Sequence, residues 1–361
     1  MKNEIALFHG MKIVELAGVL AGPAVGMFFA ELGAEVIKVE NGDQGGDITR
    51  KWKLPSEDPA SPVSAYYAGV NWGKRTINAN LESAADREAV SALIRQADIV
   101  VANFKHSSAK RLGMDYASLA ADNPGLIYAQ VEGFGGEDER PAFDVVLQAE
   151  TGFMSMTGDP GGLPAKLPVA LIDILAAHQL KEGVLVALLN RTRTGRGALV
   201  RVSLWDAAIA SLANQASNWL MAGHIPQPMG SLHPNIAPYG EVFYCADDKA
   251  LVLAVGTDRH FEALCRCVNL PDLPQQPEFA HNAARVRNRR QLQEILSPVF
   301  KSFTRKELMA RLDGNGVPAG RIRNMAEVFA LEEAKRLVLE EDLPDGTPTK
   351  RVRTAVFNLE C

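Results

Sequence analysis

The chain has 361 residues, of which 47% are apolar and 22% charged, and its formal net charge is −5. This composition is typical of a globular protein, and the negative balance argues against nucleic acid as a partner. The length exceeds that of one typical domain and predicts about two. The longest apolar run, residues 174–189, contains His178, Lys181 and Glu182, so we expect no membrane partner.

The cysteine content argues against a disulfide framework, because four cysteines are too few for a chain of this length. Cys265 and Cys267 are separated by one residue, but no second Cys or His pair nearby completes a zinc site, so we expect no metal. The first residues lack the apolar core of a secretory signal peptide. We therefore expect the protein in the reducing cytoplasm.

Strands and helices alternate in the first part of the chain. Residues 11–16 predict a buried strand, residues 17–23 a turn, and the apolar spacing that follows predicts a helix ending at Gly33. Residues 34–40 predict a second strand, which completes a βαβ unit. We expect further strands at residues 74–81, 98–102 and 126–132, with helices between them at 82–96 and 116–121. Apolar, β-branched strands in this pattern predict an α/β fold with a parallel, doubly wound sheet.

A Pro-, Gly- and Asn-rich stretch at residues 226–238 predicts a domain boundary. Before it we expect helices at residues 143–154, after Asp173 and at 206–220, with a strand in 195–204. Beyond it, residues 240–255 predict a β-hairpin. The remaining predicted elements are helices at 258–268, 287–301, 304–313 and 325–337 and strands at 317–322 and 350–357.

Two carboxylates stand in apolar surroundings, Asp144 and Asp173. Each has two interpretations. It can be a helix N-cap, which accepts hydrogen bonds from the first free amides, and local sequence favours this role because Asp is common there. It can instead do chemistry in a dry pocket, since burying both carboxylates without a role would be costly. A pair could perform acid–base work, or one carboxylate could attack while the other supports it.

Basic residues cluster in and near the loops at the expected carboxyl ends of the strands, where α/β sheets bind ligands. They are Lys38, Arg50, Lys51, Lys74, Arg75, Lys105, Lys110 and Arg111. No GxGxxG or P-loop motif is present, so a dinucleotide or nucleoside triphosphate site has little support. The cluster is either a solvated face or an anion-binding site.

Segments throughout the chain, taken in their order and spacing, resemble the class III CoA-transferases, a group that also contains the α-methylacyl-CoA racemases. The matching segments are Val14–Pro23, Leu32–Glu40, Gly46–Arg50, Asn71–Ile77, Asp98–Phe104, Arg111–Gly113, Phe143–Ala149, Arg191–Gly197 and His233–Pro238. The resemblance covers almost the whole chain. It implies a Rossmann-like large domain at residues 1–225, a smaller α+β domain at 226–325, and a C-terminal segment at 326–361 that returns to the large domain. It also implies that two chains interlock as a homodimer.

The same resemblance assigns roles to site residues. Asp173 matches the family's nucleophile, which reverses the preference for a cap, and Asp144 matches a second acidic residue that could support it. Racemases carry a histidine at the position of Phe143, so this chain is expected to be a transferase. The residues expected to contact CoA are Val19, Leu20 and Ala21 along a turn and Lys74, Arg75 and Arg111 near its phosphates.

The implied reaction moves CoA from an acyl-CoA donor to a carboxylic acid acceptor through an aspartyl anhydride and an aspartyl-CoA thioester. The expected partners are therefore an acyl-CoA and a carboxylic acid, with no tightly bound cofactor. Two alternatives remain open. One is a racemase of 2-methylacyl-CoA, and the other is a non-catalytic CoA-binding protein in which Asp173 only caps its helix.

Overall fold

The computed structural model describes residues 7–136 and 138–359. These residues form two compact units. The first unit contains the described residues of Met1–Phe153, Lys166–Ile225 and Arg336–Cys361, and the second contains Met154–Ala165 and Pro226–Lys335. Residues 154–165 and 326–335, which we expected in the large domain and the C-terminal segment, group with the second unit.

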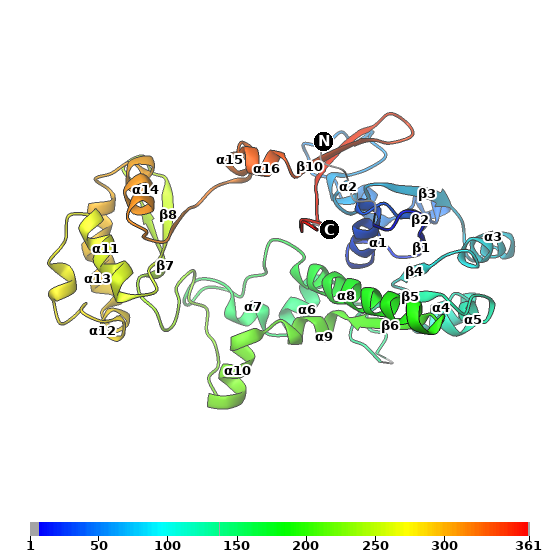
Figure 1. The fold of residues 1–361 in the computed structure, drawn as a ribbon, viewed down its shortest axis with the longest axis horizontal. Helices are drawn as coiled ribbons and strands as arrows, with labels where there is room; N and C mark the ends of the chain where they lie inside the picture. The colour runs from blue at the N-terminus through cyan, green and yellow to red at the C-terminus, as the bar shows by residue number, and fades with distance from the viewer. Residues whose placement is uncertain (1–6, 137, 360–361) are drawn as a thin grey trace. The chain divides into compact units, whose positions relative to one another are not determined.

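A six-stranded parallel sheet forms the centre of the first unit (Figure 1). Its strands are β1 (Lys12–Glu15), β2 (Glu35–Glu40), β3 (Lys74–Asn78), β4 (Ile99–Ala102), β5 (Ile127–Glu132) and β6 (Ala198–Ser203). They lie in the order β3-β2-β1-β4-β5-β6, and every neighbouring pair is parallel. The predicted doubly wound α/β sheet is confirmed. Its strand order reverses between β1 and β4, which is where such sheets bind ligands.

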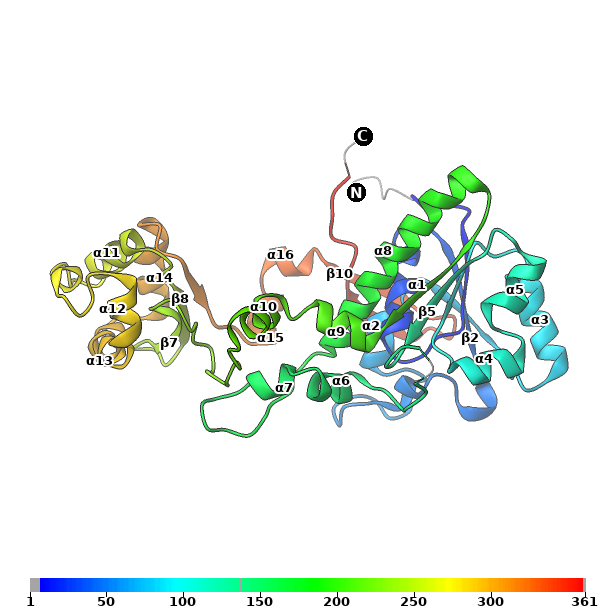
Figure 2. The same ribbon diagram turned by 90° about the horizontal axis from the view of Figure 1, so that it is seen from below.

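Helices cover both faces of this sheet (Figure 2). One face is covered by α1 (Ala21–Glu31), α8 (Leu171–Thr194) and α9 (Leu204–Ala210). The other is covered by α3 (Ala84–Ile94), α4 (His106–Leu112) and α5 (Tyr116–Asp122). Successive strand residues alternate between the two cores, as Ile13 in the first and Val14 in the second illustrate. This alternation follows from the two-residue period of a strand.

Helix α8 contains 24 residues and ends where Gly195 adopts a left-handed conformation. Its buried face includes Ile172, Ala176, Leu180 and Val184, which recur at helical intervals as predicted. Charged residues such as Lys181, Glu182 and Arg191 reduce the mean hydropathy of this helix. Within residues 7–136 and 138–359, no helix is both long enough and apolar enough to cross a bilayer.

Two predicted helices are each divided in the structure. Residues 143–154 form α6 (Asp144–Glu150) and the short α7 (Phe153–Met156), because Gly152 between them adopts a φ of +90°. The predicted helix at 206–220 is divided into α9 and α10 (Ala213–Ala222), and Ala213 at the junction has a φ of +49°. A positive φ is incompatible with a continuous right-handed helix. The helix α2 (Ala65–Asn71) and the short helices η1 (Gly42–Gln44) and η2 (Ile48–Lys51) lie between β2 and β3.

The second unit contains a three-stranded antiparallel sheet packed against helices. Its strands are β7 (Tyr239–Tyr244), β8 (Ala250–Ala254) and β9 (Ala319–Arg321), and β7 and β8 form the predicted hairpin. Its helices are α11 (Asp258–Cys267), η3 (Leu273–Gln275), α12 (Asn282–Arg287), α13 (Arg289–Phe300), α14 (Arg305–Gly314), α15 (Met325–Phe329) and α16 (Glu332–Lys335). Buried aromatic residues such as Phe243, Phe261 and Phe300 join sheet and helices.

The C-terminal segment packs against α1 of the first unit. It forms an antiparallel hairpin of β10 (Val338–Asp342) and β11 (Pro348–Val352). The buried guanidinium of Arg351 pairs with Glu31 at the end of α1. The backbone nitrogens of Thr354 and Ala355 also donate to the Glu31 carboxylate, at 3.0 and 2.6 Å. One buried carboxylate therefore attaches this segment to the large unit.

Candidate active site

Asp173 is the third residue of α8, within its first turn. The N-cap position of this helix is Ala170, whose side chain makes no cap. The interpretation of Asp173 as the N-cap is therefore wrong. Asp173 is buried, with 8% of the residue exposed, and within residues 7–136 and 138–359 its carboxylate forms no hydrogen bond or ion pair. A buried carboxylate without partners is costly, which makes it a candidate for chemistry.

The cap that α8 lacks is supplied by Asp144, from a different helix. Asp144 is the first residue of α6, and its Oδ1 accepts a hydrogen bond from the backbone nitrogen of Ile172 at 2.7 Å. This bond satisfies one of the amides that a helix start leaves free. The buried Gln148 donates to Oδ2 of Asp144 at 2.5 Å and accepts from the backbone nitrogen of Leu167 at 2.8 Å. Asp144 and Gln148 together hold the start of the helix that carries Asp173.

Burial and charge act together on the Asp173 carboxyl. Burial, and next the charge of Asp144, raise the pKa of Asp173 to about 7. The Tyr66 phenol is affected by the same surroundings. Burial raises its pKa to about 12, and the charges of Asp173, Asp144 and Asp47 contribute. A protonated phenol therefore lies within electrostatic reach of three carboxylates.

Tyr66 is a site residue that the sequence analysis missed. It lies in α2 and packs edge-on against Trp52, with ring centroids 5.1 Å apart. The residues around it form a polar loop and one short helix, with no motif that singles out this tyrosine. The electrostatic influence of Asp173 and Asp144 on the Tyr66 phenol arises only in the folded chain, because the residues are far apart in the sequence.

The turn predicted to contact CoA, Val19–Ala21, lies directly after β1, at the point where the strand order reverses. Leu20 is the N-cap of α1, and Ala21 is its first residue. The first turn of α1 contains no acidic residue, so the positive end of the helix dipole is not neutralised there. An anionic group could bind the free backbone amides at this helix start.

The three basic residues expected near the CoA phosphates lie in different settings. Lys74 is buried, and its ammonium contacts Glu15 at 2.8 Å and the Pro23 carbonyl oxygen at 2.8 Å. Burial lowers the pKa of Lys74 to about 7. Binding of a phosphate by Lys74 would require these bonds to break. Arg75 and Arg111 are exposed, and their nearest acids are Glu35 at 3.6 Å and Glu82 at 2.7 Å, respectively.

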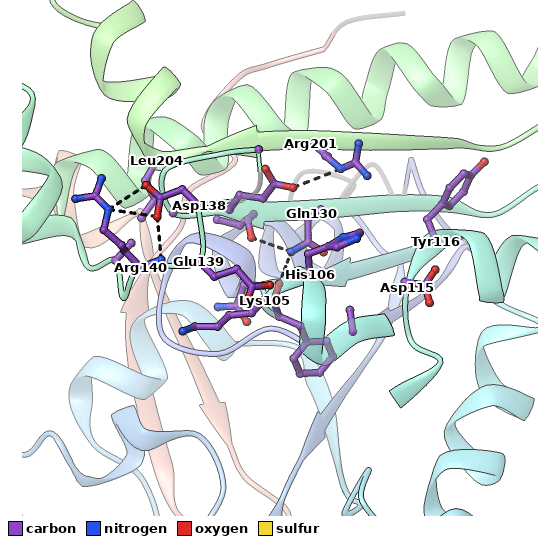
Figure 3. Close-up of a pocket in the computed structure, with 18 of the residues that line it drawn as sticks. Lys105, His106, Asp115, Tyr116, Gln130, Asp138, Glu139, Arg140, Arg201 and Leu204 are labelled. Carbon is purple, nitrogen blue, oxygen red and sulfur yellow. Dashed lines mark hydrogen bonds and ion pairs between the residues drawn. The ribbon is translucent and has the colours of Figure 1, made fainter. Parts of the chain in front are cut away.

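A pocket of about 420 Å³ lies along β5 and β6, beside the loop that follows β4 (Figure 3). The amide of Gln130 lies on its wall and donates to the carbonyl oxygen of Phe104 at 2.9 Å. Arg201 pairs with Glu132 at 3.4 Å on the same wall. Phe143 is also among the lining residues, but Asp173 is not. The pocket therefore does not contain the candidate nucleophile.

The cysteines form no site in the described residues. Cys245, Cys265 and Cys267 are free thiols buried in the core of the second unit, and Cys361 lies outside the described residues. Burial raises the pKa of the Cys265 thiol to about 12, which makes it unreactive. In the part of the chain that the structure describes, no three His, Cys, Asp or Glu side chains are arranged to hold a metal ion.

The Asp173 carboxylate, which has no partner among the described residues, lies at a helix start beside a doubly wound sheet, and such a carboxylate could act in acyl transfer. Comparison with known proteins identifies the class of enzyme. The profile of CoA-transferase family III matches residues 8–360. The chain therefore belongs to this family and is an enzyme of the CoA-transferase class, as the sequence predicted.

Named relatives and solved structures agree with this assignment. The chain is 38% identical to the succinate–glutarate CoA-transferase of Agrobacterium fabrum, over 99% of this chain and 90% of the relative. It is 34% identical to the succinyl-CoA:mesaconate CoA-transferase of Haloarcula marismortui, over 88% of this chain and 81% of the relative. The crystal structure of a CaiB/BaiF family protein from Brucella suis matches with a TM-score of 0.85 at 39% identity. This match covers 97% of this chain and 92% of the other.

Proposed function

We propose that the protein moves CoA from an acyl-CoA donor to a carboxylic acid acceptor, with Asp173 as the nucleophile. The observation that carries this proposal is the state of the Asp173 carboxyl. It is buried, it has no hydrogen-bond partner among the described residues, and its pKa is raised to about 7. Its lone pairs are free, and a carboxylate of raised basicity is a stronger nucleophile than an ordinary one.

In the first half of the reaction, a carboxylate oxygen of Asp173 attacks the thioester carbonyl carbon of the donor. The new C–O bond replaces the C–S bond, and CoA leaves as its thiolate from a mixed anhydride. The thiolate then attacks the aspartyl carbonyl of that anhydride. The donor acid leaves as its carboxylate, and Asp173 carries CoA as a thioester.

In the second half, the acceptor carboxylate attacks the aspartyl thioester and expels the CoA thiolate. The acceptor and Asp173 are then joined in a second anhydride. The thiolate attacks the acyl carbonyl from the acceptor, so that acyl-CoA is released and Asp173 is free again. Water must be excluded throughout, because it would hydrolyse the anhydrides. The burial of Asp173 supports this requirement.

Two neighbours, Asp144 and Tyr66, have supporting roles in this proposal. Asp144 holds the start of α8 through Ile172 and so positions the nucleophile. Tyr66 stays protonated at neutral pH because its pKa is about 12, and it offers a hydrogen-bond donor near Asp173 for the oxyanion that forms during attack.

For the binding of CoA, we propose that it runs along the turn of Val19, Leu20 and Ala21. The free backbone amides at the start of α1 support this position. Arg75 and Arg111 are exposed and could exchange their present carboxylate neighbours for phosphate. Lys74 remains a proposed phosphate contact only if CoA binding releases its ammonium from Glu15.

For the substrates, we propose a pair of short dicarboxylic acids, with succinyl-CoA as a donor. The names of two relatives that are 38% and 34% identical to the chain support this class, because both include succinate or its CoA ester. The second acid differs between these names, so the acceptor must be found by experiment.

We also propose that two copies assemble, as the interlocked homodimer implied by the family resemblance. Helix α10 contains no buried residue and exposes Trp219, Leu220 and Met221, which are 52%, 79% and 88% accessible. A helix that exposes such large apolar side chains is typical of an interface. Sedimentation velocity should give a dimer for the wild type and a shift toward monomer for Leu220→Asp. A wild-type monomer would contradict this assembly.

Intact-protein mass spectrometry after mixing with a panel of acyl-CoAs tests the nucleophile. We expect a CoA adduct that hydroxylamine removes and that is absent from Asp173→Asn. A matched control is Asp86→Asn, because Asp86 is likewise the third residue of its helix, α3. An adduct on Asp173→Asn would contradict the proposal. Exchange of the α-proton of a 2-methylacyl-CoA into deuterated buffer, with no adduct, would instead support a racemase.

A further inference from the structure

Val19 has an unusual backbone conformation for its residue type. Its φ is +72°, in the left-handed region that β-branched residues rarely adopt. Such strain persists only where the surrounding structure enforces it, and it clusters at functional sites. Val19 lies after β1 at the reversal of strand order, in the turn for which we propose contact with CoA.

Two side chains hold this turn from either side. The Asp47 carboxylate accepts from the backbone nitrogen of Val19, with Oδ2 at 3.1 Å. The Asn103 side chain accepts from the backbone nitrogen of Gly18 at 3.2 Å and donates to its carbonyl oxygen at 3.0 Å. These bonds hold the two peptide groups before the Cα atom of Val19, namely Ala17–Gly18 and Gly18–Val19.

Asp47 is itself fixed by a buried ammonium. The Lys38 Nζ atom lies 3.1 Å from Oδ2 of Asp47, 3.1 Å from Glu15 and 2.8 Å from the carbonyl oxygen of Ala17. All three ammonium protons therefore have partners, and two of these, Glu15 and Ala17, lie in the segment that precedes the turn. The backbone nitrogen of Thr49 donates to the other Asp47 oxygen at 3.0 Å.

A buried ion cluster is weak evidence for stability, and its best-attested use is to specify one conformation. We infer that Asp47 is a positioning residue that keeps Val19 left-handed and thereby orients the turn amides for CoA. This inference rests on the proposed CoA contact of the turn. Without the Asp47 acceptor, Val19 would relax to a negative φ and turn its peptide groups away from that orientation.

A double-mutant cycle with Val19→Gly tests this inference, because glycine adopts a positive φ without strain. Isothermal titration calorimetry with free CoA gives the dissociation constant for wild type, Asp47→Ala, Val19→Gly and the double variant. We expect Asp47→Ala to weaken CoA binding about 10-fold, which corresponds to about 1.4 kcal/mol. In the glycine background the same substitution should cost about twofold or less.

Asp43→Ala is the matched control. Asp43 is an exposed carboxylate of the same loop that bonds Asn80, and its loss should leave CoA affinity unchanged. If Asp47→Ala does not fold, Asn103→Ala replaces it in the cycle, because Asn103 holds the same turn from an exposed position. An equal loss of affinity in both backgrounds, or no loss, would overturn the inference. Absence of CoA binding by the wild type would instead overturn the proposed function.

Discussion

The Oδ1 atom of Asp144 lies 2.7 Å from the backbone nitrogen of Ile172, the residue that precedes Asp173. One carboxylate therefore completes the helix start on which the other stands. The two acids have different roles because one has hydrogen-bond partners and the other has none within the described residues.

Replacement of Asp144 by Ala should reduce both stability and activity. It leaves the Ile172 amide and the Gln148 side chain without their acceptor, which costs about 1–3 kcal/mol for a buried donor. It also removes a charge that raises the pKa of Asp173, so the pH profile of kcat/KM should move to lower pH. Asp144→Asn keeps an acceptor for Ile172 and should be more stable to urea than Asp144→Ala. Equal stability of the two variants would contradict this role.

The pH dependence of the first chemical step should follow the ionisation of Asp173. In the proposed reaction only the ionised carboxylate attacks, and burial raises the pKa of Asp173 in the free protein to about 7. We therefore expect kcat/KM to fall about tenfold per pH unit below about pH 7 and to level off above it. Initial rates across this range, at several donor concentrations, give the profile. A constant kcat/KM down to pH 5 would show that Asp173 titrates as an ordinary acid.

Asp173 should destabilise the fold at alkaline pH. Its ordinary pKa is about 4, so between pH 4 and pH 7 the unfolded chain ionises while the folded chain stays protonated. The stability that Asp173 contributes is therefore fully present below pH 4 and is lost as the pH rises through 7. This loss lowers the free energy of unfolding by about 4 kcal/mol at most. Asp173→Asn does not titrate and should have a higher Tm than the wild type at pH 8 and the same Tm at pH 4. A difference that does not change with pH would contradict this account.

Tyr66→Phe should slow formation of the CoA adduct while leaving the fold intact. The ring contact with Trp52 is kept, and only the hydroxyl near Asp173 is lost. Loss of a hydrogen bond to a developing charge costs about 1.5–3 kcal/mol, or at least about 10-fold in rate. Rapid quench followed by mass spectrometry measures the rate, with Tyr116→Phe in α5 as the control. An unchanged rate would exclude the phenol from the reaction.

The attachment of the C-terminal segment to the first unit should depend on Glu31. Glu31→Ala leaves the buried Arg351 guanidinium without its ion pair, which costs about 3–5 kcal/mol. The double variant Glu31→Leu/Arg351→Met removes both charges and should recover part of that loss. Limited proteolysis, followed by mass spectrometry, should show cleavage near residue 345 in Glu31→Ala alone. Equal stability of the single and double variants would contradict the assignment.

Local signals in the amino-acid sequence were sufficient to predict several helices and strands. Strands such as β1 and β4 and the long helix α8 follow from two-residue and helical periodicity, and the alternation of these elements predicts the parallel sheet. The order of several short segments was also sufficient to identify the family. These properties need no knowledge of which distant residues meet.

The roles of individual polar side chains, in contrast, depend on contacts that form when the chain folds. Asp144 accepts from the amide of Ile172, 28 positions later in the chain, and Lys74 turns from a surface cation into a buried partner of Glu15. The left-handed Val19 is held by Asp47, again 28 positions away. Each outcome depends on a contact between distant segments, and the hydrogen-bond and desolvation energies that decide it exist only after the chain has folded.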